Sequence, residues 1–220
     1  GSPKVTAELV IDDTKIYDRN IILDNGNISF KDNYLELDLA LRDESSRTPV
    51  ELRGIYPLAN SLPIDLKVES HGDGLVFLTG LTKGSVSWTS GMADLSLIVR
   101  GTPESPIANG FLALKNSEFL FQGKEINNMN STIVFDFNRV EVQRFKANLG
   151  QSGVINSQGG ISLFESQLVE SDPLAISIEK TRIKTEFTDV KVSSKIIVKG
   201  SVLKPQLAGE VLISEGSISA

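Results

Sequence analysis

The chain of 220 residues contains no cysteine, one histidine and one tryptophan. The absence of cysteine excludes a disulfide scaffold and any zinc or redox site built from thiolates. The single histidine, His71, lies in the polar segment 70–74. It has neither a second histidine nor a cysteine with which to form a familiar catalytic triad. We therefore interpret His71 as an exposed loop residue, and we expect no enzymatic activity and no cofactor.

The sequence also lacks clustered basic residues and spaced metal ligands. The chain has 22 Lys and Arg against 28 Asp and Glu, which gives a net charge of −6. Nucleic-acid binding needs a concentration of Lys and Arg, so we expect no nucleic-acid partner. The acidic pairs Asp12-Asp13 and Asp43-Glu44 have no calcium-ligand spacing, and we interpret them as solvated turns rather than a metal site or a hydrolase dyad.

The dominant pattern is an alternation of apolar and polar residues with a period of two. Residues 35–42 place four leucines on one face of an extended chain and Glu36, Asp38 and Arg42 on the other. Similar runs recur along the whole chain. Their apolar members form the candidate interior set: Leu35, Leu37, Leu39, Leu41, Ile64, Leu66, Val68, Leu95, Leu97, Val99, Leu112, Leu114, Ile133, Phe135, Phe137, Phe145, Leu149, Ile176, Ile178, Val211 and Ile213.

Turn signals separate these runs, among them residues 24–27, 31–33 and 158–160. Only residues 74–81 have apolar side chains at helical spacing, behind a possible N-cap at Asp73, and a short buried strand is the alternative there. The pattern therefore predicts an all-β protein with more than a dozen antiparallel strands and at most one or two short helices.

One flat sheet of this size would expose a very large apolar face, so we expect the sheet to twist and curl. Its apolar interior is then either a closed core, as in a sandwich, or an open groove for a guest chain. The interior set is aliphatic, and no polar groups cluster there for a specific small ligand. This composition favours an open groove with a greasy, unspecific guest.

A strand–turn–strand unit occurs twice, around residues 95–117 and 194–217. Gly101, Pro106 and Gly110 in the first unit match Gly200, Pro205 and Gly209 in the second, at identical spacing. We interpret these residues as structural turns, with glycine at bends and proline where no ladder N–H is needed. The recurrence indicates an array of β-units.

These units, together with residues 54–66, 75–81, 91–110 and 198–209, resemble the C-terminal part of the TamB family, within the AsmA-like, bridge-like lipid-transfer superfamily. The likeness spans most of residues 50–220. It implies a long sheet folded into an open, taco-like groove without catalytic residues. It also implies an inner-membrane anchor in the parent protein and a partner of the TamA/BamA type, an outer-membrane β-barrel insertase. Chloroplast relatives link the two envelope membranes in preprotein import.

We interpret Gly1-Ser2 as a protease-cleavage scar and residues 3–220 as one elongated β-groove from a longer protein. The expected location is the periplasm or the equivalent plastid envelope. The expected function is transport of phospholipid, through its acyl chains, between the membranes, or support of outer-membrane protein insertion. Two alternatives remain: a docking or chaperone module that binds an insertase or unfolded strands by β-augmentation, and an inert spacer or β-solenoid with a solid interior.

Overall fold

The computed structural model describes residues 5–8, 14–16, 19–150, 152–163, 172–184, 188–202 and 204–218. Most of them belong to strands. The strands are β1 (Val5–Glu8), β2 (Thr14–Ile16), β3 (Arg19–Lys31), β4 (Tyr34–Asp43), β5 (Val50–Pro57), β6 (Ile64–Ser70), β7 (Val86–Thr102), β8 (Ser105–Phe121), β9 (Lys124–Phe137), β10 (Arg139–Leu149), β11 (Gly153–Ser162), β12 (Leu174–Lys184), β13 (Thr188–Gly200) and β14 (Pro205–Ile218).

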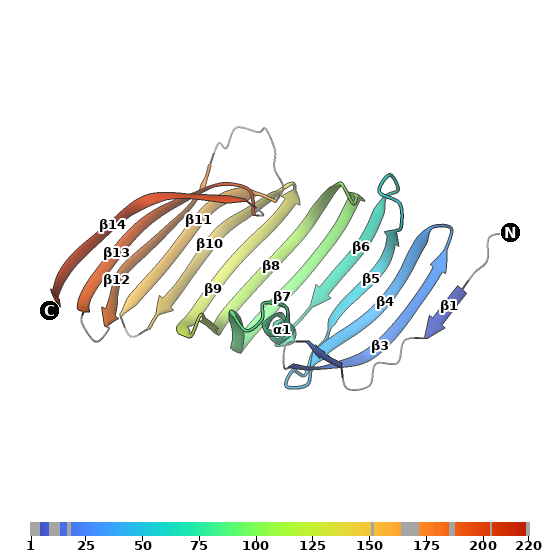
Figure 1. The fold of residues 1–220 in the computed structure, drawn as a ribbon, viewed down its shortest axis with the longest axis horizontal. Helices are drawn as coiled ribbons and strands as arrows, with labels where there is room; N and C mark the ends of the chain where they lie inside the picture. The colour runs from blue at the N-terminus through green and yellow to red at the C-terminus, as the bar shows by residue number, and fades with distance from the viewer. Residues whose placement is uncertain are drawn as a thin grey trace.

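These strands form one 14-stranded sheet in which, from β3 onward, each strand pairs antiparallel with the next in the chain. Both β1 and β2 pair with β3. Figure 1 shows the result as a single twisted layer that runs from the blue N-terminal strands to the red β14. Within the described strands the sheet does not close, because β14 pairs only with β13. The predicted all-β, antiparallel, curled sheet is confirmed.

The two repeated units are β-hairpins. In the first unit Gly101 lies directly opposite Pro106, and the two strands are the longest of the sheet at 17 residues each. In the second unit Gly200 lies opposite Pro205 in the same way. Pro106 is the second residue of β8 and Pro205 the first of β14, and proline is tolerated at the start of a strand, where it disturbs the ladder least. These four residues therefore flank the turns, as the sequence predicts.

The other two glycines of the repeat do not lie in turns, and that prediction is wrong. Gly110 is inside β8 opposite Leu97, and Gly209 is inside β14 opposite Ile196. A Cβ built on Gly110 would lie 2.0 Å from the carbonyl oxygen of Ser96, and one on Gly209 would lie 2.2 Å from that of Lys195. Glycine is needed here because the opposite backbone comes too close for any side chain.

Two further turn predictions also fail, since residues 24–27 lie within β3 and residues 158–160 within β11. In β3 the polar residues mark a shift in register between Leu23 and Asn25 rather than a chain reversal. A β-bulge uses the same glycine and asparagine residues as a turn, which explains the error. The turn at Lys31–Asn33 is confirmed, because Lys31 pairs with Tyr34 across it.

The segment predicted to be helical is a 3-10 helix, η1 (Gly74–Phe77), followed by a single α-helical turn, α1 (Leu78–Leu81). Leu75 and Val76 of η1 are buried in the main hydrophobic cluster of the described residues. That cluster also includes Trp88 and Ala93 of β7, Leu114 of β8, Ile126 and Met129 of β9, and Ala147 of β10. The core therefore lies between the helical segment and one region of the sheet.

Candidate functional site: the apolar face

Cross-strand pairing shows which side chains share a face, because residues directly opposite each other in neighbouring strands point the same way. One continuous row crosses β4 to β11 through Leu39, Leu52, Val68, Leu97, Gly110, Phe135, Val140 and Ile161. A second row crosses β10 to β14 through Phe145, Ser157, Ile176, Ile196 and Gly209. We call the side of the sheet that carries these rows the apolar face.

All 21 residues of the candidate interior set lie on the apolar face. The pairings place Leu35, Leu37, Leu41, Ile64, Leu66, Leu95, Val99, Leu112, Leu114, Ile133, Phe137, Leu149, Ile178, Val211 and Ile213 there beside those already named in the two rows. The register brings them onto one surface although they come from eight strands.

Exposure of the apolar face changes along the sheet. Ile64 is 5% exposed and Leu114 is 9% exposed, whereas Val211 and Ile213 on β14 are 69% and 64% exposed. Most of the set between these extremes is half-buried. A single layer leaves such a face in contact with solvent wherever no second layer covers it. The face is therefore buried in the cluster that contains η1 and at single positions such as Ile64, and it is an open apolar surface at β14.

Sequence reasoning missed several members of the apolar face. Leu52 on β5, Val142 on β10, Ile155 on β11 and Ile196 on β13 occupy it through pairing with residues of the predicted set. Their own sequence runs show the alternation less clearly. At Leu52 the alternation is visible in the sequence, because this leucine lies between the charged residues Glu51 and Arg53.

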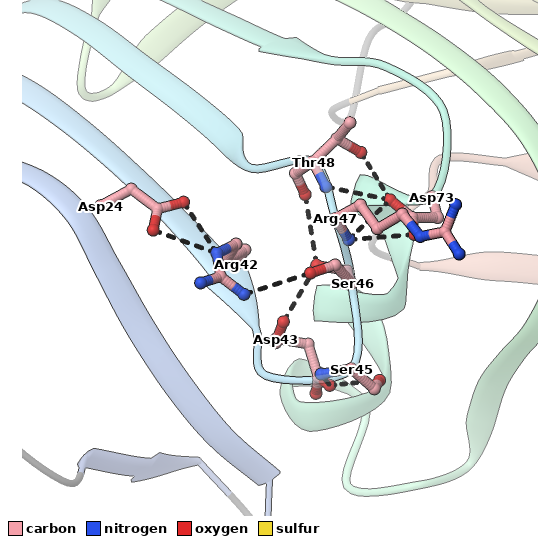
Figure 2. Close-up of polar contacts among 8 residues, drawn as sticks. All are labelled: Asp24, Arg42, Asp43, Ser45, Ser46, Arg47, Thr48 and Asp73. Carbon is pink, nitrogen blue, oxygen red and sulfur yellow. Dashed lines mark hydrogen bonds and ion pairs between the residues drawn. The ribbon is translucent and has the colours of Figure 1, made fainter.

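The opposite face carries polar side chains and cross-strand ion pairs. Arg53 contacts Asp38 at 3.1 Å and Arg100 contacts Asp65 at 3.3 Å. Figure 2 shows Arg42 bonded to Asp24, with its Nε 2.9 Å from the carboxylate. Exposed pairs of this kind add little stability each. They do mark this face as the solvated side of the sheet.

The helical segment Gly74–Leu81, here called the strap, covers part of the apolar face. Leu75 and Val76 are 4% and 8% exposed and belong to the same cluster as Trp88 and Ala93 of β7. Half-buried Leu95, Leu112, Phe145 and Ile155 pack against that cluster. The strap therefore closes the apolar face beside β4, β5 and β7, at the lower edge of the sheet in Figure 1.

Hydrogen bonds hold the strap at both ends. At its start, the Asp73 carboxylate accepts hydrogen bonds from the backbone N–H groups of Arg47 and Thr48, at 3.0 to 3.1 Å, and from Thr48 Oγ1 at 2.7 Å (Figure 2). Farther along, Thr79 Oγ1 accepts a hydrogen bond from the backbone N–H of Trp88 at 3.2 Å. The strap is thus tied to the β4–β5 loop and to β7.

These contacts change the acidity of Asp73. Burial by itself raises the pKa of this carboxyl, but the hydrogen bonds from Thr48 and from the backbone of Arg47 and Thr48 outweigh burial. The net result is a pKa below the ordinary aspartate value. Asp73 therefore holds the strap as a carboxylate at neutral pH.

The remaining sequence candidates lie apart from the apolar face. The side chain of His71 is 68% exposed, and its Nδ1 is 3.0 Å from Asp94. Asp43 is buried and forms an ion pair with Arg19 at 2.9 Å, while Glu44 is exposed. Asp12 and Asp13 lie outside the described residues. Among the residues that the structure describes, no three His, Asp or Glu side chains come together as a metal site.

The fold and this surface define a class: a one-layer antiparallel β protein with one continuous apolar face. Residues 143–220 match the family model described as the TamB C-terminal domain. The resemblance of the chain to the TamB family is confirmed by this match.

Two curated relatives are similar over longer stretches. Protein TIC236, chloroplastic, from Arabidopsis thaliana is 21% identical over 175 residues, which cover 78% of this chain and 8% of that protein. Protein SUBSTANDARD STARCH GRAIN 4, chloroplastic, from Oryza sativa subsp. japonica is 23% identical over 146 residues, or 65% of this chain and 7% of that protein. The chain thus spans less than a tenth of either relative. No solved structure matches it. Within the described residues, no helix combines the length and hydropathy that a bilayer crossing requires.

Proposed function

We propose that the apolar face binds the acyl chains of phospholipids and that the chain is part of an envelope protein that carries phospholipid between an inner and an outer membrane. The continuous apolar row across β4 to β11 is the observation that carries this proposal. Support of outer-membrane protein insertion is a second role compatible with the same surface.

The physical basis is burial without specific recognition. Removing a CH₂ group from water stabilises it by about 0.8 kcal/mol, so an acyl chain gains energy wherever it lies along the row. The row offers Leu, Val, Ile and Phe side chains, and the ion pairs lie on the opposite face. A guest held only by burial can move along such a surface, because successive positions are chemically alike.

The similarity to the TamB family supports an envelope location for this function. The TamB domain and the two chloroplast relatives point to an envelope-associated protein. We place the parent protein in the periplasm, or the plastid equivalent, with an inner-membrane anchor. Its outer-membrane partner would be a β-barrel insertase of the TamA/BamA type.

Two adjacent residues of β14 provide a matched test. Val211 is 69% exposed and pairs with Ser194, whose row belongs to the apolar face, whereas Leu212 is 65% exposed and pairs with Ser193 on the opposite face. Val211→Asp and Leu212→Asp therefore introduce the same charge at the same exposure on opposite faces. Native mass spectrometry of protein purified from cells, with lipid extraction, should show less phospholipid for Val211→Asp only.

Two results of this measurement would contradict the proposal. Equal phospholipid content in both variants, or none in the unmodified protein, would overturn binding at this face. A lipid-free protein whose interior excludes an apolar dye would indicate a closed core instead.

A second candidate function is docking by β-augmentation at the edge of β14. Within the described strands β14 pairs only with β13, so the backbone groups along its other edge have no strand partner. Such an edge accepts an added strand from an insertase or an unfolded β-barrel protein. Photocrosslinkers at Leu212 would capture protein under this alternative, and crosslinkers at Leu97 would capture lipid under the first proposal.

A further inference from the structure

The sequence shows no run of basic residues, but the sheet brings three cations together around an open hollow. The hollow has a volume of about 700 Å³ and lies across β10 to β13. Its lining includes Arg144 and Lys146 from β10 and Lys195 from β13, and it contains no Asp or Glu. The three side chains are separated by up to 51 residues in sequence (195 − 144) and meet only through strand pairing.

The hollow lies on the face opposite to the apolar one. Its lining contains two cross-strand rows, one of Lys146, Asn156, Ser177 and Lys195 and one of Gln158, Ala175 and Ile197. The lining also contains Phe145, Ser157, Ile176 and Ile196, the apolar-face row that runs between these two rows. Apolar-face residues farther along the strands, such as Ile155 and Ile178, do not line the hollow, whereas opposite-face residues on both sides of the central row do. The hollow therefore opens on the face of Lys146, Ser177 and Lys195, with the backbone of the central row beneath it.

The three cations of the hollow form no ion pair within the described residues. Seven other basic side chains form ion pairs on this chain, whereas Arg144, Lys146 and Lys195 have no carboxylate within ion-pair distance. The nearest acidic position in the register is Glu210, opposite Lys195 on β14. All three cations are exposed, so an incoming anion can reach them.

The shape of the hollow favours an acidic peptide over an anionic membrane surface as the partner. Its centre is formed by short side chains, Ala175 and Ser177 on β12, between the long cationic side chains of β10 and β13. A planar bilayer cannot enter a recess of this kind, whereas a peptide can. Asn156 and Gln158 offer amide N–H donors at the floor, and Ala175 and Ile197 offer a small apolar contact.

We propose that this hollow binds an acidic, extended segment of a partner protein. The backbones of β10 and β13 are three strand spacings apart, about 14 Å. Carboxylates four residues apart on an extended peptide are separated by about 13 to 14 Å and point the same way. The residue midway between them also points that way, toward Ala175 and Ile197, and a small apolar side chain fits there.

The probe follows from this spacing: a labelled peptide, N-acetyl-Glu-Ser-Val-Ser-Glu-amide, measured by fluorescence anisotropy with the full chain. We expect binding that weakens with added salt. Arg144→Gln, Lys146→Gln and Lys195→Gln combined should weaken binding at least tenfold, because charge-assisted hydrogen bonds are lost. A peptide of the same composition with its glutamates two residues apart should also bind less tightly.

A matched control changes the same net charge elsewhere. Lys31, Lys115 and Lys124 are exposed, and their combined change to Gln should leave peptide binding unchanged. Equal weakening by the control triple, or no binding of the peptide, would overturn the proposal. So would loss of binding to phosphatidylglycerol-containing vesicles in the site triple without loss of peptide binding, since that result identifies a membrane as the partner. Phospholipid content after purification should stay unchanged in the site triple, which separates this hollow from the apolar face.

Discussion

Gly110 lies directly opposite Leu97 in the β7–β8 hairpin, with φ of +150° and no space for a side chain. A Cβ at Gly110 would meet the carbonyl oxygen of Ser96 at 2.0 Å and Leu97 Cα at 2.9 Å. Gly209 opposite Ile196 and Gly54 opposite Leu66 are in the same situation. The apolar face therefore has no side chain at these three positions, because the backbone of the opposite strand leaves no space for one.

Gly110→Ala should destabilise the protein by about 3 kcal/mol, because the new methyl group can be accommodated only by moving the backbone of β7. Urea unfolding followed by circular dichroism measures this. Gly123→Ala is the control, since Gly123 has a φ of +75° but nothing within 4 Å of the added Cβ. It should cost only about 1 kcal/mol, from the left-handed backbone alone. Equal losses for both variants would show that the close approach at Gly110 is relieved easily.

The strap makes a measurable contribution to the core. Leu75→Ala should cost about 2 to 5 kcal/mol, because Leu75 is 4% exposed and its removal leaves a cavity. The sole tryptophan, Trp88, belongs to the same cluster, so its fluorescence should shift to the red and become more accessible to acrylamide. Leu58→Ala, at a residue 56% exposed, should change neither property. An unchanged Trp88 spectrum in Leu75→Ala would contradict the position of the strap.

Asp73 should make part of the stability sensitive to acid. Its pKa is lowered in the folded protein, so its contribution is complete above the unfolded-state pKa and is lost as pH falls through the folded one. We expect the free energy of unfolding to fall below about pH 4, near the ordinary aspartate pKa. Asp73→Asn should show a smaller fall in that range, measured by urea unfolding at several pH values. Glu125→Gln, which changes an exposed carboxyl, is the control; an equal effect there would contradict a special role for Asp73.

A charge on the apolar face should block lipid binding while the sheet stays folded. Phe135→Arg lies on this face, and Phe111→Arg, at a residue 43% exposed, lies on the opposite one because Phe111 pairs with Ser96 and Val134. Only Phe135→Arg should lower the phospholipid that co-purifies, with the far-ultraviolet circular dichroism of both variants unchanged. If Phe135→Arg unfolds the protein, the interior is a closed core at that position.

The candidate surface was predictable because alternation is a local property of the chain. Leu35, Leu37, Leu39 and Leu41 share a face in any extended conformation, whatever their neighbours are. The prediction that Gly110 and Gly209 are turns failed because glycine serves turns, bulges and close backbone approaches alike. Which of these applies depends on the strand opposite, and a single sequence does not identify that strand.

Sequence alone determined that the chain is all-β and that one face of each strand is apolar, because both follow from the period of two. For residues 74–81 it left a short helix and a buried strand open, and the structure decided for the helix. Tertiary structure decided the register that joins Leu39 to Ile161 in one row. It also decided the place of the strap over Trp88 and the meeting of Arg144, Lys146 and Lys195. These features depend on contacts between residues far apart in the chain, and pairing across many strands is what creates them.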